Sequence, residues 1–171
     1  DQTLLVISGD HGIPRSCYEK MPGSLFDESV HVPLIFYNPG LKHRTVTAHC
    51  GLMDIAPTIL NLLGMESCRD FQGRILNRPL DPSHPVIMES LGPGPCDLRY
   101  KAMKIAVIRY RYKLIWREPG YEKTCPSGQN YLFDLKSDPE ERNNLYTDPK
   151  YKRIRSDLEG IVLARCAEIR S

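Results

Sequence analysis

A run of apolar residues near the start of the chain leads directly into a carboxylate and an imidazole. Residues Leu4–Ser8 read LLVIS, and Gly9, Asp10, His11 and Gly12 follow them. A short apolar run without alternation predicts a strand covered on both faces, as in the parallel sheets of α/β proteins. Such sheets bind ligands beyond the carboxyl ends of their strands. We therefore expect Asp10 and His11 to serve one site, with Gly12 permitting the turn that this requires.

The rest of the first stretch, to about residue 80, also reads as α/β. A second apolar run, Val32–Tyr37, predicts another strand, and DIAPTILNLLG predicts a short helix. Asp54 is placed to cap that helix, Pro57 falls in its first turn, and Gly64 is placed to end it. We interpret residues 1–80 as part of an α/β core with a parallel sheet.

The second stretch, residues 81–171, follows loops rich in proline and glycine and has a different pattern. Residues 100–117 alternate apolar and basic side chains towards their end, which predicts one strand with a polar face, and residues 131–135 predict another. SDPEERNNL reads as a turn and a polar helix start, and the tail carries Ile154, Leu158 and Val162 at helical spacing. We expect a small antiparallel sheet followed by a C-terminal helix.

Composition excludes some classes of protein and leaves others open. The net charge of +2 gives no bulk attraction for polyanions, and no apolar run approaches the roughly 20 residues of a membrane span. No signal peptide is visible, and the chain opens straight into a predicted strand, so we expect a fragment or a processed chain. The six cysteines lack CxxC spacing, which argues against a zinc ribbon and leaves disulfides and free thiols both open.

One segment is strongly basic: residues 99–117 contain seven Lys or Arg and no acid. It could contact a polyanion, such as a sulfated glycan or nucleic acid. We favour a half-exposed strand with Arg109, Arg111 and Lys113 on its wet face and tyrosines packed inside.

The ordered motifs resemble the sulfatase family. SGDHG is followed by SLFDESVHVPLIFYNPG, then by MDIAPTILNLLG, FQGRIL, RYKLIW and LFDLKSDPEERNNL. Each has a counterpart in that family, in the same order, so the resemblance covers nearly the whole chain. Within the family, HVPLIFY and the Asp10–His11 pair most resemble the iduronate-sulfatase branch. The resemblance implies an α/β fold: the C-terminal part of an alkaline phosphatase-like sandwich (residues 1–80), then a small C-terminal α+β subdomain (residues 81–171).

The resemblance also implies an activity, hydrolysis of sulfate esters, and a set of cofactors. Sulfatases use a formylglycine made from the cysteine of a CxPSR motif, together with Ca²⁺. The family's Asp–Asn or Asp–His metal pair maps onto Asp10 and His11. The carboxylate suits Ca²⁺, whereas the imidazole is more at home on Zn²⁺, the alternative. The family's sulfate-binding lysine maps onto Lys20, a candidate catalytic and substrate-binding residue, with Arg15 as a second candidate for the oxyanion.

The nucleophile motif is missing. Cys125-Pro126-Ser127-Gly128 lacks the spacer and the arginine, and it lies far downstream of the expected position. We expect formylglycine upstream, in an N-terminal portion of the same protein, and no hydrolysis by this chain alone. The expected substrate is a sulfated small molecule or glycan, with no nucleic acid, in a lysosomal, periplasmic or extracellular setting.

Four other polar residues favour structural roles. We expect His31 to pack against its neighbours or to make a buried hydrogen bond. We expect His49 to cap the following helix or to pair locally. We expect Asp54 to cap a helix. Glu89 ends an apolar run, and we favour a structural role for it over a place in the substrate pocket.

Two alternative functions stay open. One is a Zn-dependent phosphodiesterase or phosphonate hydrolase of the same superfamily. The other is a non-catalytic module that binds anionic glycan through the strand of Arg109, Arg111 and Lys113.

Overall fold

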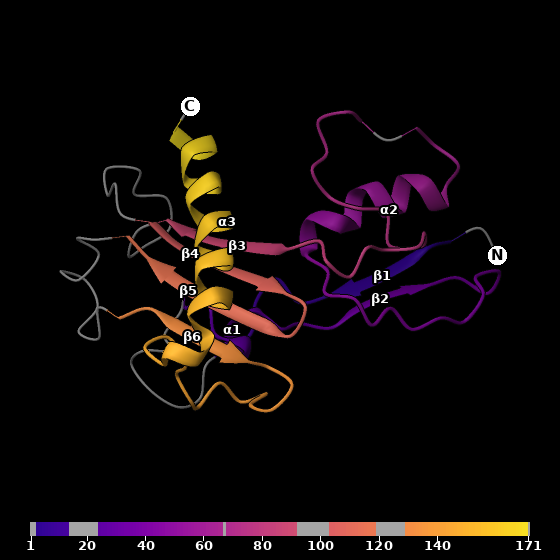
Figure 1. The fold of residues 1–171 in the computed structure, drawn as a ribbon. Coiled ribbons are helices and arrows are strands. Elements are labelled where there is room, and N and C mark those ends of the chain that lie inside the picture. The colour runs from indigo at the N-terminus through magenta and orange to yellow at the C-terminus, as the bar shows by residue number, and fades with distance from the viewer. Residues whose placement is uncertain (1–2, 14–23, 67, 92–102, 119–128, 171) are drawn as a thin grey trace.

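A computed structural model describes residues 3–13, 24–66, 68–91, 103–118 and 129–170. Within these residues the strands form two sheets, a pair and a set of four (Figure 1). The elements are, in chain order, β1 (Leu5–Ser8), α1 (Asp27–Val30), β2 (Leu34–Tyr37), the 3-10 turn η2 (Leu52–Asp54), α2 (Ile55–Leu62), β3 (Val86–Leu91), β4 (Met103–Arg109), β5 (Tyr112–Arg117), β6 (Tyr131–Asp134), the 3-10 turn η4 (Pro149–Tyr151) and α3 (Lys152–Arg170).

β1 and β2 are the two strands predicted from the apolar runs, but they pair antiparallel, so the expected parallel arrangement is wrong for this pair. Leu5 lies opposite Tyr37 and Ile7 opposite Ile35. These four side chains share one face, and each is between 47% and 58% exposed. An apolar run shows that a strand can be covered, but not in which direction its neighbour runs.

α2 confirms the predicted helix and its end. Pro57 lies in the first turn, where its missing N–H costs nothing, and it is buried together with Thr58. The chain leaves the helix at Gly64, whose φ of +70° lies in the region that favours glycine.

The second sheet is antiparallel, as predicted, with strand order β3-β4-β5-β6. The single strand expected from residues 100–117 is wrong, because β4 and β5 form a hairpin in which Arg109 lies opposite Tyr112. The turn between them is Tyr110-Arg111, and Tyr110 has a φ of +55°. Tight hairpin turns usually place Gly or Asn at such positions, so Tyr110-Arg111 carries no recognisable turn signal.

Both faces of this sheet are covered. On one face Ile105, Val107 and Leu114 pack against Leu158 and Val162 of α3, which crosses the sheet in Figure 1. On the other face Leu25 and Phe26, just before α1, pack on Ala106, Ile115 and Phe133. Residues from the first stretch of the chain thus complete the core of the second sheet.

The wet face predicted for the basic strand is wrong for Lys113, although the side chain of Arg111 is 47% exposed. Lys113 is fully buried and Arg117 is 5% exposed, whereas Tyr110 is 57% exposed. The alternation does not continue through the hairpin. Arg109 lies opposite Tyr112 and shares its face, whereas Lys113 lies opposite Ile108 on the other face, which the segment around α1 covers.

The C-terminal helix is confirmed, with Leu158, Val162 and Cys166 buried. Its expected start in SDPEERNNL is wrong, because residues 135–148 form turns and the helical backbone begins at Pro149. Asp148 caps that start: its side chain accepts a hydrogen bond from the Lys150 backbone N–H at 2.9 Å.

Cys50 and Cys166 are free thiols, and the Cys68 thiol lies 3.8 Å from Asp70 Oδ2; Cys17, Cys96 and Cys125 lie outside the described residues. None of the helices in the described part of the chain is long and apolar enough to cross a membrane. The proposed boundary near residue 80 stays a prediction.

Candidate metal-binding loop

The two candidate metal ligands lie side by side just after β1. Asp10 Oδ2 lies 3.8 Å from His11 Nε2, and the side chains are 90% and 68% exposed. Asp10 Oδ1 accepts a hydrogen bond from the His11 backbone N–H at 2.8 Å. That bond is the main reason why the pKa of the Asp10 carboxyl is lowered from its ordinary value. The carboxylate is therefore ionised at neutral pH.

The imidazole of His11 is oriented by the backbone. Its Nδ1 lies 2.8 Å from the carbonyl oxygen of Gly12, which can only accept a hydrogen bond. Nδ1 is then the protonated nitrogen of the neutral ring, so Nε2, the atom facing Asp10, carries the free lone pair. A carboxylate oxygen and a basic nitrogen therefore point into the same space.

Gly12 fixes this loop on the backbone of α1. Its N–H donates to the carbonyl oxygen of Ser29 at 2.8 Å. A Cβ at Gly12 would lie 2.1 Å from the carbonyl oxygen of Glu28, which leaves no room for any side chain. The glycine is thus required by close approach of two backbones.

This donor pair fits part of a cation shell. The 3.8 Å separation is less than twice a Ca–O distance of about 2.4 Å, so one ion can touch both atoms. Among the described residues no group of three or more His, Cys, Asp or Glu side chains could hold a metal. Ca²⁺ takes six to eight ligands, so Asp10 and His11 would supply only two of them.

Lys20 and Arg15, the two candidate sulfate-binding residues, lie outside the described residues, as does the Cys125–Gly128 segment. Their roles stay predictions.

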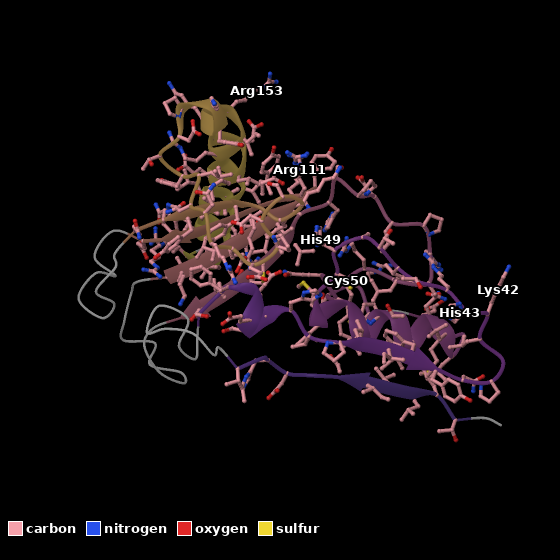
Figure 2. The ribbon with its side chains drawn as sticks, turned by 90° about the horizontal axis from the view of Figure 1, so that it is seen from below. Lys42, His43, His49, Cys50, Arg111 and Arg153 are labelled. Atoms are coloured by element: carbon pink, nitrogen blue, oxygen red, sulfur yellow. The ribbon has the colours of Figure 1, made fainter. Side chains whose placement is uncertain are left out.

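The histidines predicted to be structural occupy unexpected positions. The side chain of His31 is 81% exposed and lies 3.8 Å from Asp27, so packing or a buried hydrogen bond is wrong for it. His49 makes no local pair: its Nε2 lies 2.7 Å from the carbonyl oxygen of Tyr110, which is 61 residues away. Figure 2 shows His49 and Cys50 beside the hairpin tip that carries Arg111.

Asp54 sits at the N-cap position of α2, but its side chain does not cap that helix. It is buried and accepts hydrogen bonds from the backbone N–H groups of Gly51 and Arg74, at 3.0 and 2.6 Å. The Arg74 guanidinium adds an ion pair at 3.0 Å. Asp54 therefore joins the start of α2 to the FQGR segment, which a capping rule does not foresee.

The structural role that we favoured for Glu89 is confirmed. Its Oε1 accepts from Arg165 Nε of α3 at 2.5 Å, which ties the helix to β3.

Sequence reasoning missed a buried ion cluster at the start of α1. Lys113 Nζ lies 2.5 Å from Asp27 Oδ1 and 2.6 Å from Glu141 Oε1. Burial raises the pKa of Glu141, and Lys113 opposes that shift. In the sequence the cluster is indicated only by a lysine between apolar strand residues. Its role follows from contacts with residues that are far away in sequence.

Comparison with known proteins shows which enzymes this chain resembles. Residues 1–65 match the family model Sulfatase. The Delta 4,5-hexuronate-2-O-sulfatase of Bacteroides thetaiotaomicron is 28% identical over 171 residues, covering 94% of this chain and 34% of that protein. The chain is similar to the sulfatase family and spans about a third of the length of the curated relatives it matches.

Solved structures agree on the fold. A 2-O GAG sulfatase superposes with a TM-score of 0.73 at 24% identity, covering 98% of this chain and 37% of the other. The phosphonate monoester hydrolase of Agrobacterium radiobacter superposes with a TM-score of 0.67 at 21% identity, covering 96% and 35%. The alkaline phosphatase-like fold is thereby confirmed. The assignment to the iduronate-sulfatase branch stays a prediction.

Proposed function

We propose that this chain is the part of a sulfuric ester hydrolase that supplies Asp10 and His11 to the metal site. The observation that carries the proposal is the Asp10–His11 donor pair at the end of β1, inside the residues that match the sulfatase family. Sulfatases generally use a metal ion and a formylglycine. The formylglycine and the remaining ligands would come from a portion of the protein outside this chain.

Each residue of the loop has a chemical task in this proposal. The ionised Asp10 carboxylate would hold the cation, and His11 Nε2 would bind it or accept a hydrogen bond. A bound cation polarises the sulfate oxygens and so stabilises the charge that develops on them. Lys20, with Arg15 as the second candidate, would neutralise charge on the leaving oxygen.

We favour Ca²⁺ over Zn²⁺ because the pair offers a hard, fully ionised oxygen and lies on an exposed loop. The observation in favour of Zn²⁺, and with it of a phosphodiesterase or phosphonate hydrolase, is the His11 imidazole, whose Nε2 lies 3.8 Å from the Asp10 carboxylate.

The uncovered apolar face of the β1–β2 pair supports an N-terminal partner portion. Leu5, Ile7, Ile35 and Tyr37 are about half exposed on that face. A two-stranded sheet is marginal by itself, and an apolar face of this kind is normally packed against further structure. The rest of the sulfatase core would cover it.

The described residues give little support to the glycan-binding module. Lys113 is buried in its ion cluster, and Arg111 pairs with Asp134 at 2.5 Å. Arg109 Nε donates to the carbonyl oxygen of Ser83. The strand thus lacks the row of free cations that polyanion binding needs. A sulfated sugar is nevertheless the substrate class we propose, in a lysosomal, periplasmic or extracellular compartment, because the relative from B. thetaiotaomicron is named a hexuronate-2-O-sulfatase.

The test is sulfate ester hydrolysis by the full-length natural protein, with Asp10→Ala compared to Asp81→Ala. Asp81 is a matched control: it too is an exposed carboxylate whose pKa is lowered by hydrogen bonds, in its case from Ser83. We expect Asp10→Ala to lower kcat/KM at least about 100-fold and Asp81→Ala to change it less than twofold. Equal activity of the two variants would exclude Asp10 from the site.

The metal is tested separately, by elemental analysis of the purified protein and by His11→Asn. The family accepts Asn at this position, so a Ca²⁺ site should survive the change. A Zn²⁺ site should lose its metal, because an amide is a poor zinc ligand.

A further inference from the structure

The buried ion cluster consists of Lys113 on β5, Asp27 at the start of α1 and Glu141 in the loop after β6. Lys113 Nζ contacts both carboxylates, at 2.5 and 2.6 Å. Glu141 Oε2 also accepts the backbone N–H of Asp27 at 2.7 Å. One carboxylate thus binds both the lysine and the first turn of α1.

Packing alone does not account for this cluster. Lys113 is fully buried, and the side chain of Glu141 is 1% exposed. Apolar side chains at such positions usually stabilise a fold as well as buried charges do. Glu141 also has a φ of +55°, a conformation that is unfavourable for a residue with a side chain. Unlike apolar packing, the charged contacts are directional, so each of them holds α1 in one position over the sheet.

α1 needs that support because it consists of four residues, Asp27–Val30. The internal hydrogen bonds of a single helical turn do not hold it together in water. Its other anchors include the packing of Phe26 on the sheet and the 2.7 Å contact between the hydroxyls of Ser24 and Ser29.

The same turn holds the candidate metal loop. Ser29, two residues after Asp27, accepts the hydrogen bond of the Gly12 backbone N–H, and the Glu28 carbonyl lies against Gly12. Gly12 in turn receives the Nδ1 bond that orients His11. An unbroken series of contacts therefore leads from the ion cluster to both donor atoms.

We propose that Lys113, Asp27 and Glu141 are positioning residues that fix the Asp10–His11 donor pair through the backbone of α1. This inference rests on the proposed function for the role of the pair, but the mechanical coupling itself can be measured without catalysis.

The experiment is hydrogen–deuterium exchange at pH 7 on the full-length natural protein and on Lys113→Met, read in peptides that cover residues 9–13. Two controls isolate the coupling. Arg111→Met removes a cation of the β4–β5 turn, whose partner Asp134 lies on β6 rather than on α1. Leu158→Ala loosens the core on the α3 face of the sheet and reports general destabilisation.

We expect Lys113→Met to speed exchange at residues 9–13 by about tenfold or more, the effect of losing one charge-assisted contact from a local opening. The two controls should stay within about twofold there. Titration with Ca²⁺ should show weaker binding for Lys113→Met and unchanged binding for Arg111→Met. Should Lys113→Met not fold, Asp27→Asn, at a carboxylate that is 26% exposed, replaces it.

Equal exchange at residues 9–13 in Lys113→Met and the wild type, or equal acceleration in Leu158→Ala, overturns the inference. The proposed function fails in a different way, through a wild-type protein that neither binds Ca²⁺ or Zn²⁺ nor cleaves sulfate esters. In that case the exchange data alone decide whether the cluster positions the loop.

Discussion

The contact between Gly12 and α1 makes Gly12→Ala the sharpest stability test. The added Cβ would lie 2.1 Å from the Glu28 carbonyl oxygen and 3.1 Å from its carbon, and both are backbone atoms that cannot rotate away. The backbone φ of Gly12 is not in the left-handed region, so collision is the only penalty for alanine.

The size of the penalty follows from the distances. Reaching normal contact requires the two backbones to separate by about 1 Å. That shift lengthens the 2.8 Å bond from the Gly12 N–H to Ser29 beyond hydrogen-bond range. Overpacking and the lost hydrogen bond together lower the free energy of unfolding by about 2–4 kcal/mol.

The assay is urea denaturation of the 171-residue chain, followed by fluorescence of Trp116, its one tryptophan, which packs against the core beneath α3. Gly160→Ala is the matched control. Gly160 lies in α3 with nothing within 4 Å of its added Cβ, so alanine there should raise stability by about 0.5–1 kcal/mol. A Gly12→Ala variant within 0.5 kcal/mol of the wild type would refute the reasoning.

Three further outcomes are expected. Leu158→Ala, at a side chain buried under α3, should lower the free energy of unfolding by about 2–5 kcal/mol, whereas Leu163→Ala, at a side chain 58% exposed on the same helix, should change it by less than about 0.5 kcal/mol; urea denaturation compares them. Burial raises the pKa of Tyr146 above 10, so the folded state holds its phenolic proton more tightly than the unfolded chain. Stability should therefore decline as pH rises from about 10, and denaturation curves for Tyr146→Phe should show a flatter decline. Burial also raises the pKa of the Cys166 thiol, so iodoacetamide should modify exposed Cys68 at least about tenfold faster, as measured by peptide mass spectrometry; equal rates would mean that α3 opens readily.

Local sequence rules predicted the elements whose signals are local. Pro57 and Gly64 marked the two ends of α2, and the spacing of Leu158 and Val162 marked the buried side of α3. The Asp10–His11 pair was found from its place after an apolar run. The motif order led to the sulfatase family.

The features that were missed depend on contacts between distant segments. Tyr110-Arg111 contains no residue type that predicts a turn, because the residue with positive φ is a tyrosine. Lys113 looked like a surface lysine until residues 24–30 were found to cover its face of the sheet. The direction of β2 relative to β1 is equally invisible, since both strands are apolar in either arrangement.

The exposure of Asp10 and His11 has a consequence for how such a site can change over time. Backbone contacts from Gly12 hold the loop, while the two side chains pack against almost nothing. Replacing either one therefore costs little folding free energy, so under the proposed function a lineage could exchange the cation without rebuilding the loop. The ligand side chains of the proposed site can change in evolution while the backbone that holds them is kept.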